Sequence, residues 1–309
     1  MPAFYKSNKV IIINGDALET LKKMPSESVD CCVTSPPYFG LRDYGVNGQI
    51  GLEKTPEEYI KKCTEVFMEV YRILYKNGTL WLNIGDSYAS GTCGRDDSGN
   101  SGRFAGVRLN PKKRFTPSGF KQKDMIGIPW TLAFALRVYG WYLRQDIIWS
   151  KPNTMPEPVR DRCVKAHEYI FLLSKSKKYY FDYLAVQEPA VSKHKSGNGF
   201  LRDARLSFQN VDGSFRGNNK QWLPTTKRNL RDVWTINTKP YKGAHFATFP
   251  IELVERCILA GCKKGGVVLD PFLGSGTTAY VAQKLNRKCI GIELNTEYCR
   301  LAKNRILDV

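Results

Sequence analysis

The chain has 309 residues, enough for one large α/β domain with an insertion, and a formal net charge of +18 at pH 7. No N-terminal stretch has the pattern of a signal peptide, and no uninterrupted apolar run approaches the ~18 residues of a membrane span. The nine cysteines include no Cys-x-x-Cys pair and there are only three histidines, so neither a zinc site nor a disulfide framework is expected. The sequence therefore predicts a cytoplasmic protein with reduced, mostly buried thiols, no membrane partner and no metal.

The apolar and turn patterns predict strands alternating with helices. One helix should begin after Thr55, because Pro56 occupies its first turn and Glu58 completes a capping box. In chain order, the predicted elements are a strand at 10–14, a helix at 17–24, a strand at 29–34, a helix at 55–75, a strand at 79–84, a loop at 86–123, a helix at 129–139, strands at 143–149 and 169–173, a helix at 249–260, a strand at 267–270, a helix at 279–285 and a strand at 288–293. This order predicts an α/β fold with a mostly parallel, twisted sheet, helices on both faces and ligands at the carboxyl ends of the strands.

The segment Ser35-Pro36-Pro37-Tyr38 directly follows the predicted strand at 29–34. Two consecutive prolines have no backbone N–H and hold φ near one value, so the strand should end in a stiff turn whose carbonyls are free to accept. Ser35 and the Pro36 carbonyl are suited to accept the amino protons of a flat ring that stacks on Tyr38. Taken alone, the four residues are more typical of a plain proline-rich loop. A second motif makes the binding interpretation the stronger one.

That second motif combines the apolar run 267–269 with a glycine turn at 270–278 and a helix-like segment. The next predicted strand ends at Glu293, where a carboxylate is placed to accept from ribose hydroxyls. This is the strand–turn–helix layout of a nucleotide-type cofactor site, in which glycines allow the backbone to approach the ligand. The turn lacks the Gly-x-x-x-x-Gly-Lys-Ser/Thr phosphate pattern and carries Asp270, which suits a cationic ligand such as S-adenosylmethionine.

Together the two motifs resemble those of the β-class, circularly permuted, S-adenosylmethionine-dependent amino-group DNA methyltransferases (the N4-cytosine/N6-adenine family). The resemblance covers nearly the whole chain and implies a Rossmann-like methyltransferase fold in which the catalytic motif precedes the cofactor motif. Segments 14–18, 245–250 and 147–153 are similar to those that hold the cofactor adenine, pack on its methionine part and flank the target base. The implied catalytic residues are Ser35, Pro36, Pro37 and Tyr38. The implied cofactor-binding residues are Asp16, Phe246, Asp270, Pro271, Phe272, Gly274, Ser275, Gly276, Thr277, Thr278 and Glu293.

Most of the positive charge lies in two segments. Residues 89–123 contain eight Lys/Arg and two Asp, and residues 191–242 contain eleven Lys/Arg and three Asp, so they carry +14 of the net +18. Basic loops with interleaved aromatics are typical of a surface that follows a phosphate backbone, although solvated surface loops would look similar. We therefore predict a catalytic part at 1–185 with a mobile basic loop at 89–123, a target-recognition insert at 186–241, and a cofactor-binding part of the same domain at 242–309.

The predicted reaction is methyl transfer from S-adenosylmethionine to the exocyclic amino nitrogen of a base flipped out of duplex DNA. The chain has no Pro-Cys dipeptide, which argues against the covalent cysteine mechanism of enzymes that methylate carbon 5 of cytosine. Family members with Ser before Pro-Pro-Tyr mostly resemble N4-cytosine enzymes. We therefore favour N4 of cytosine, with N6 of adenine as the alternative.

Double-stranded DNA is the expected partner. RNA stays an alternative substrate, because charge does not separate the two, whereas the intact motifs argue against a non-catalytic nucleic-acid-binding protein. Substrate contacts are assigned to Lys151, Asn153, Arg202, Arg205, Arg216, Lys227 and Arg228, without deciding which of them reads a base. The sequence leaves open whether a cognate restriction endonuclease acts on the same site, and whether the protein is a monomer or a weak homodimer.

Overall fold

The computed structural model describes residues 3–89, 103–104, 107–108, 116–190, 226–238 and 250–307. The chain divides into two compact units, one formed by Met1–Asp182 with Arg231–Val309 and the other by Tyr183–Leu230. The described part of the smaller unit contains a two-stranded antiparallel pair, β9 (Glu188–Pro189) with β10 (Lys227–Arg228). The larger unit contains the main sheet and both sequence motifs.

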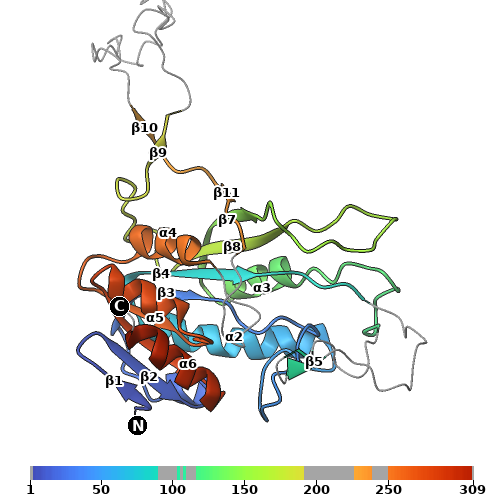
Figure 1. The fold of residues 1–309 in the computed structure, drawn as a ribbon, viewed down its shortest axis with the longest axis horizontal. Coiled ribbons are helices and arrows are strands. Elements are labelled where there is room, and N and C mark those ends of the chain that lie inside the picture. The colour runs from blue at the N-terminus through green and yellow to red at the C-terminus, as the bar shows by residue number, and fades with distance from the viewer. Residues whose placement is uncertain are drawn as a thin grey trace, which may run out of the picture. The chain divides into compact units, whose positions relative to one another are not determined.

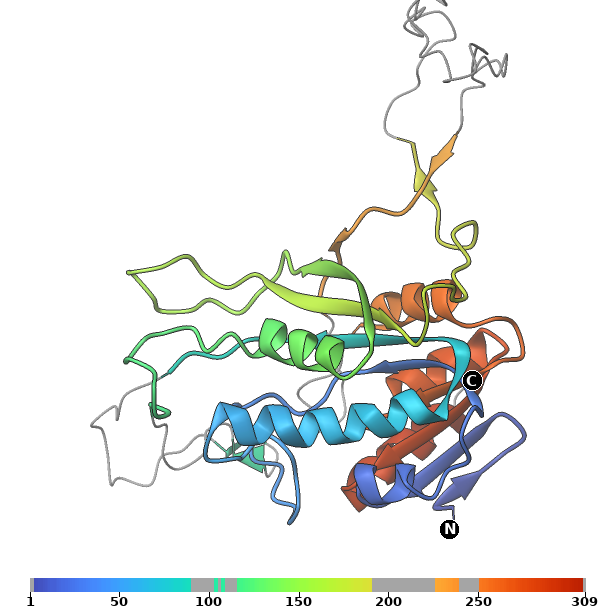
Figure 2. The same cartoon turned by 180° about the vertical axis from the view of Figure 1, so that it is seen from behind.

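The main sheet has nine strands in the order β1-β2-β13-β12-β3-β4-β8-β7-β11 (Figures 1 and 2). The run from β2 to β4 is parallel, β8 is antiparallel to both of its neighbours, and β11 is parallel to β7. The strands are β1 (Tyr5–Lys6), β2 (Val10–Asn14), β3 (Val29–Thr34), β4 (Leu74–Ile84), β7 (Tyr142–Ser150), β8 (His167–Ser174), β11 (Val233–Thr235), β12 (Val267–Asp270) and β13 (Lys288–Glu293). Apart from this sheet, β5 (Arg103–Phe104) pairs with β6 (Val107–Arg108).

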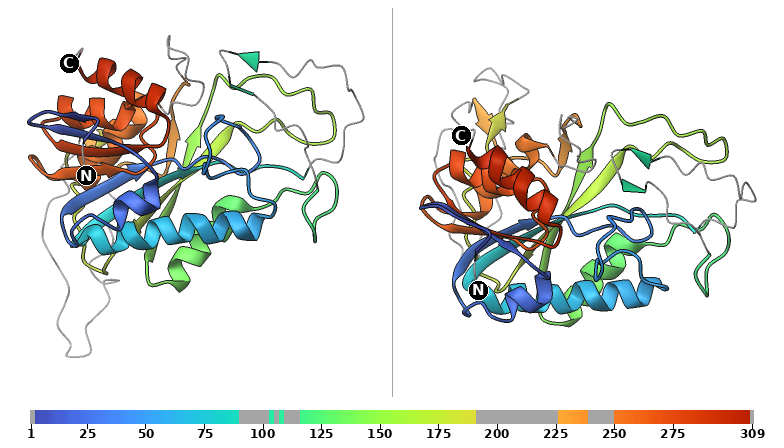
Figure 3. Two further views of the ribbon diagram at one scale, coloured as in Figure 1. Left: turned by 90° about the horizontal axis from the view of Figure 1, so that it is seen from below. Right: turned by 60° about the horizontal axis from the view of Figure 1, so that its bottom comes forward.

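Helices cover both faces of the main sheet, as Figure 3 shows. On one face α1 (Ala17–Leu21), α2 (Pro56–Ile73) and α3 (Ile128–Val138) pack in sequence. On the other face lie α4 (Ile251–Gly261), α5 (Thr277–Lys284) and α6 (Thr296–Leu307). The predicted α/β fold class is therefore confirmed. Helix α6 and strand β11 were not predicted from the sequence.

The strands at the centre of the sheet alternate between two buried faces. Cys32 and Leu80 belong to the apolar cluster beneath α2 and α3. Cys31 and Trp81 point the other way, because an added Cβ at Gly261 of α4 would lie 3.1 Å from the Cys31 sulfur and 2.3 Å from the Trp81 indole nitrogen. Successive side chains of a strand point to opposite faces of the sheet, and both faces are covered here. This explains why the central strands are almost entirely apolar.

Helix α2 begins as predicted and ends earlier than predicted. The Thr55 hydroxyl accepts from the backbone N–H of Glu58 at 3.2 Å, with Pro56 in the first turn. The helix was expected to continue to residue 75, whereas Leu74 is already extended and pairs with Val29 of β3. Strand pairing therefore overrides the local helical pattern at this end.

Most of the described thiols are buried. Seven of the eight cysteines in the described ranges are inaccessible, and Cys163 is exposed. Burial raises the pKa of the Cys31 and Cys32 thiols well above the ordinary value. Neither thiol is a nucleophile in this environment, in line with the absence of a Pro-Cys motif.

Candidate active site

The two sequence motifs meet where the strand order reverses. From β12 the chain continues through α5 to β13 on one side, and from β3 it continues through α2 to β4 on the other. Strands β12 and β3 are neighbours, with Leu269 opposite Cys32. The crevice at such a switch point is where open α/β sheets bind their ligands. The glycine turn and the Ser35–Tyr38 turn both begin at this edge.

A buried hydrogen bond joins the two motifs directly. The Thr34 hydroxyl donates to Oδ1 of Asp270 at 2.7 Å, across a sequence separation of 236 residues. The other carboxylate oxygen accepts from the Thr278 hydroxyl at 2.6 Å, and the Phe272 N–H donates to Oδ1 at 3.1 Å. Burial raises the pKa of Asp270 to about 6, against the opposing effect of these donors. Asp270 is only 1% exposed and anchors the glycine turn to β3. A direct contact with the cofactor stays a prediction.

The glycine turn has a backbone that requires glycine at two positions. Gly274 has φ of 54° and Gly276 has φ of 82°, both in the left-handed region. A Cβ on Gly276 would also lie 2.8 Å from the Cβ of Ala302 in α6. The turn therefore packs α5 tightly against α6.

The hydroxyls and the proline of the turn face the interior. Arg305 of α6 donates to the Thr277 hydroxyl at 2.8 Å and to the Ser275 hydroxyl at 3.3 Å. Pro271 is buried, and Phe272 packs against the core cluster. These side chains shape the turn and anchor it to α6 and to the core. Their assignment as cofactor-binding residues stays a prediction.

Two acids surround the predicted ribose and adenine region. Glu293 accepts from the N–H groups of Gly274 and Asn295, each at 2.8 Å, and burial raises its pKa to about 7. Each of its oxygens keeps a second lone pair for a hydroxyl donor. Asp16 caps α1 by accepting from the Glu19 N–H at 2.9 Å. A glycine turn followed by an acceptor at the next strand end fits a ribose-containing cofactor.

The catalytic turn is held by hydrogen bonds that leave one carbonyl available. The Tyr59 hydroxyl of α2 donates to the Pro37 carbonyl at 2.9 Å. Within the described part of the chain, no hydrogen bond occupies the Pro36 carbonyl. Ser35 lies next to it and is partly exposed. The role of the Ser35 hydroxyl and the Pro36 carbonyl as acceptors for a base stays a prediction.

Tyr38 is fixed by residues from three other strands or strand ends. Its hydroxyl donates to Oε2 of Glu168 at 2.7 Å and approaches Oδ1 of Asn83 at 3.3 Å. The ammonium of Lys151 bonds to Oε1 of the same glutamate. A Cβ on Gly85 would lie 2.7 Å from Cε2 of the Tyr38 ring. Lys151, which was assigned to the substrate, thus points to Glu168.

Glu168 and Asn83 were missed in the sequence analysis. A usable signal was present for Asn83, a polar residue in the otherwise apolar run Leu80-Trp81-Leu82-Asn83-Ile84, where it is 3% exposed. A buried polar side chain needs partners, and a carboxylate is a common one. Glu168 carried no such signal, because it was placed just outside the predicted strand.

The remaining predicted substrate residues fall into two groups. Asn153 binds Thr238 through both its amide oxygen and its amide nitrogen, which fastens the loop after β7 to the segment after β11. In the smaller unit Arg228 bonds to Glu188 at 2.7 Å, and the neighbouring Lys227 is exposed. Outside the described residues lie Arg202, Arg205, Arg216, Phe246 and most of the predicted basic loop 89–123.

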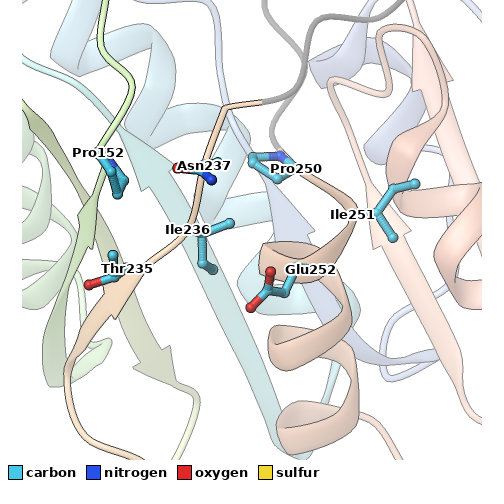
Figure 4. A pocket seen from close by; sticks show the side chains of 7 residues that line it. All are labelled: Pro152, Thr235, Ile236, Asn237, Pro250, Ile251 and Glu252. Carbon is cyan, nitrogen blue, oxygen red and sulfur yellow. The ribbon is translucent and has the colours of Figure 1, made fainter.

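A cavity of about 450 Å³ opens beside the start of α4 (Figure 4). It is lined by Pro152, Thr235, Ile236, Asn237, Pro250, Ile251 and Glu252. Pro152 belongs to the segment predicted to flank the target base, and Pro250 ends the segment predicted to pack on the methionine part of the cofactor. Neither the glycine turn nor Ser35–Tyr38 lines this cavity, so it is at most an extension of the crevice at the switch point.

The described residues do not support a metal centre or a membrane span. In those ranges no three His, Cys, Asp or Glu side chains are grouped so as to bind a metal ion. None of the helices that the structure describes has both the length and the apolar character needed to cross a bilayer.

The similarity to known proteins extends over nearly the full chain, and the different comparisons agree with one another. A family model described as DNA methylase, for the N6 and N4 enzymes, matches residues 29–304. Type II methyltransferase M.SmaI from Serratia marcescens is 51% identical over 98% of this chain and 91% of its own length, and M.Cfr9I from Citrobacter freundii is 48% identical over 97% and 88%. A DNA modification methylase from Thermus thermophilus, TTHA0409, solved with S-adenosyl-L-methionine, has a TM-score of 0.60 at 25% identity and covers 98% of this chain and 94% of its own.

PvuII DNA methyltransferase (cytosine-N4-specific) shares the fold, with a TM-score of 0.64 at 20% identity, covering 99% of this chain and 89% of its own. The extent of the family match and the identity to whole-length relatives show that this chain belongs to the N6/N4 family of DNA methylases, and that it is a methyltransferase whose cofactor is S-adenosylmethionine.

Proposed function

We propose that this methyltransferase transfers a methyl group to the exocyclic N4 amino group of a cytosine that is flipped out of duplex DNA. The observation that carries the proposal is the junction at the switch point, where the Thr34–Asp270 hydrogen bond of 2.7 Å fastens the Ser35–Tyr38 turn to the glycine turn. A base held by the first turn and a cofactor held by the second therefore lie at the same edge of the sheet. The amino nitrogen of a paired and stacked base cannot be aligned with the methyl group that it attacks, so the base must leave the duplex.

The residues of the catalytic turn orient the amino group. The Ser35 hydroxyl and the Pro36 carbonyl accept its two protons, which directs the nitrogen lone pair away from the ring, and Tyr38 supports the ring by stacking. When bound, S-adenosylmethionine supplies an electrophilic methyl group. No strong base is needed, because the methylated amine is cationic and loses its proton readily. Positioning and electrostatics supply most of the acceleration.

The choice of cytosine depends on Ser35. A neutral hydroxyl at this position accepts from an amino group without adding a charge, and family members with Ser before Pro-Pro-Tyr mostly resemble N4-cytosine enzymes. The assay is incubation of the purified protein with unmethylated bacterial DNA and S-adenosylmethionine, followed by mass spectrometry of the nucleosides. N4-methylcytosine supports the proposal, whereas N6-methyladenine overturns the base assignment. Methylation of structured RNA alone would overturn duplex DNA as the substrate.

We also propose the smaller unit, Tyr183–Leu230, as the main part of the target-recognition insert. The sequence segment 191–242 that overlaps it carries a strongly basic balance, which suits a polyanionic partner. The relatives M.SmaI and M.Cfr9I are named type II methyltransferases. A restriction endonuclease with the same site is therefore a reasonable partner, and genome neighbourhood together with cleavage protection of methylated DNA tests it.

A further inference from the structure

A charged hydrogen-bonded cluster lies behind the catalytic turn and is not part of either sequence motif. Glu168, the second residue of β8, is at its centre: Oε2 accepts from the Tyr38 hydroxyl at 2.7 Å and from the Asn83 amide at 3.2 Å. Oε1 is bonded to the Lys151 ammonium. The Asn83 amide also donates to the Tyr169 carbonyl at 3.1 Å. Each partner therefore has a defined position, set by β4, β7 and β8.

The charges of the cluster are paired and mostly withdrawn from water. The side chains of Glu168 and Lys151 are 16% and 15% exposed. The Lys151 ammonium lies 4.2 Å from the centre of the Trp149 ring, which adds a cation–π contact. Removing one partner of such a pair leaves an uncompensated charge, so the pair holds both side chains in place.

The same environment keeps the phenol of Tyr38 protonated. Burial and then the neighbouring Glu168 carboxylate raise the pKa of Tyr38 well above its ordinary value. The phenol therefore stays protonated and donates its hydrogen to the Glu168 carboxylate. A hydrogen bond to a charged acceptor is stronger and more directional than one between neutral groups.

Packing completes the restraint on the ring. At Gly85 a Cβ would lie 2.7 Å from Cε2 of Tyr38 and 3.4 Å from Cγ of Glu168. Only glycine lets the end of β4 approach the ring this closely. The ring is thus held at its hydroxyl by a charge-assisted bond and along one edge by the backbone of β4.

We propose that Glu168 is a positioning residue for methyl transfer: it holds the Tyr38 ring on which the target base stacks, and the ion pair with Lys151 holds the Glu168 carboxylate in place. The inference rests on the proposed function, since it needs a base on Tyr38. It goes beyond the proposed function, because Glu168 belongs to neither sequence motif and acts through its hydrogen bond to Tyr38. A ring that is already oriented needs no reordering when the base arrives, which lowers the barrier to reaction and leaves cofactor binding unaffected.

The test is a double-mutant cycle between Tyr38 and Glu168. Tyr38→Phe keeps the stacking surface and removes the hydroxyl, and Glu168→Gln keeps the shape and removes the charge. Single-turnover methyl transfer to unmethylated bacterial chromosomal DNA is measured for both single variants and for the double variant. Each single change should lower the rate constant about tenfold, and the double variant should be about tenfold slower as well, because both changes remove the same restraint.

Controls separate positioning from folding. Glu69→Gln breaks a more exposed ion pair, with Arg72 at 2.7 Å on α2, and Tyr71→Phe removes a tyrosine hydroxyl that donates to a backbone carbonyl at 3.4 Å. Both control variants should turn over at the wild-type rate. The dissociation constant for S-adenosylmethionine, measured by calorimetry, should be unchanged in Tyr38→Phe and Glu168→Gln, which also shows that these variants are folded.

Two results would overturn the inference. A double variant about a hundredfold slower than wild type would show independent effects, and wild-type turnover in either single variant would show that the hydrogen bond has no role. Failure of the proposed function has a different signature. Wild-type protein that binds S-adenosylmethionine and methylates no DNA would reject the function and the positioning with it, whereas wild-type methylation with an additive cycle rejects the positioning alone.

Discussion

Replacing Gly276 by alanine tests whether the tight glycine turn is a structural requirement of the cofactor site. Two costs follow from the structure. Its φ of 82° lies in the left-handed region, which costs an L-residue about 1–2 kcal/mol. The new Cβ would also lie 2.8 Å from the Cβ and 2.9 Å from the Cα of Ala302, an overlap of the kind that costs about 1–3 kcal/mol. We therefore expect Gly276→Ala to lower the free energy of unfolding by about 2–5 kcal/mol.

Gly265→Ala is the matched control for this change. Gly265 has φ of 73°, and an added Cβ there meets nothing within 4 Å, so that only the conformational cost of about 1–2 kcal/mol applies. Urea unfolding followed by circular dichroism gives both values. Gly276→Ala should also weaken S-adenosylmethionine binding in calorimetry, and Gly265→Ala should not. Equal destabilisation by the two substitutions would refute the close packing of the turn on α6.

The other predictions concern the carboxylates and the catalytic ring. Tyr38→Ala should lose most turnover and keep its affinity for S-adenosylmethionine; unchanged turnover would exclude the stacking role. Asp270→Ala should weaken cofactor binding and lower the free energy of unfolding by about 2–5 kcal/mol, because the hydroxyls of Thr34 and Thr278 lose their buried acceptor; a loss below about 1 kcal/mol in urea unfolding would contradict the anchoring role. Since burial raises the pKa of Glu293 to about 7 and ribose hydroxyls need the ionised acceptor, cofactor affinity should rise with pH through 7. Glu293→Gln should flatten that dependence in calorimetry, and an unchanged slope would point to another group.

Local patterns predicted the elements whose ends are set by neighbours in sequence. The Thr55 cap, with Pro56 in the first turn, correctly places the start of α2. The glycines at 274 and 276 correctly indicated a tight turn, and both of them have a positive φ in it. The end of α2 was misplaced, because Leu74 pairs with Val29 from a distant part of the chain. A helix end of that kind has no local signal.

The contacts of the side chains in the glycine turn also depend on a distant part of the chain. Sequence similarity groups Ser275, Thr277 and Thr278 with the cofactor site. Their hydroxyls bond to Arg305 and Asp270 at distances of 2.6 to 3.3 Å, and their contact with the cofactor stays a prediction. Which face of a turn a hydroxyl occupies depends on the helix packed against it, and α6 was not predicted.

The fold class, the two motifs and the family resemblance follow from local patterns, because alternating strands and helices, a double proline and a glycine turn constrain the backbone locally. The contact between Thr34 and Asp270, and the grouping of Glu168, Asn83 and Lys151 around Tyr38, depend on how distant strands pack. These contacts join residues 17 to 236 positions apart and involve three different strand ends. Strand order and register place them together, and neither is written in any short stretch of the chain.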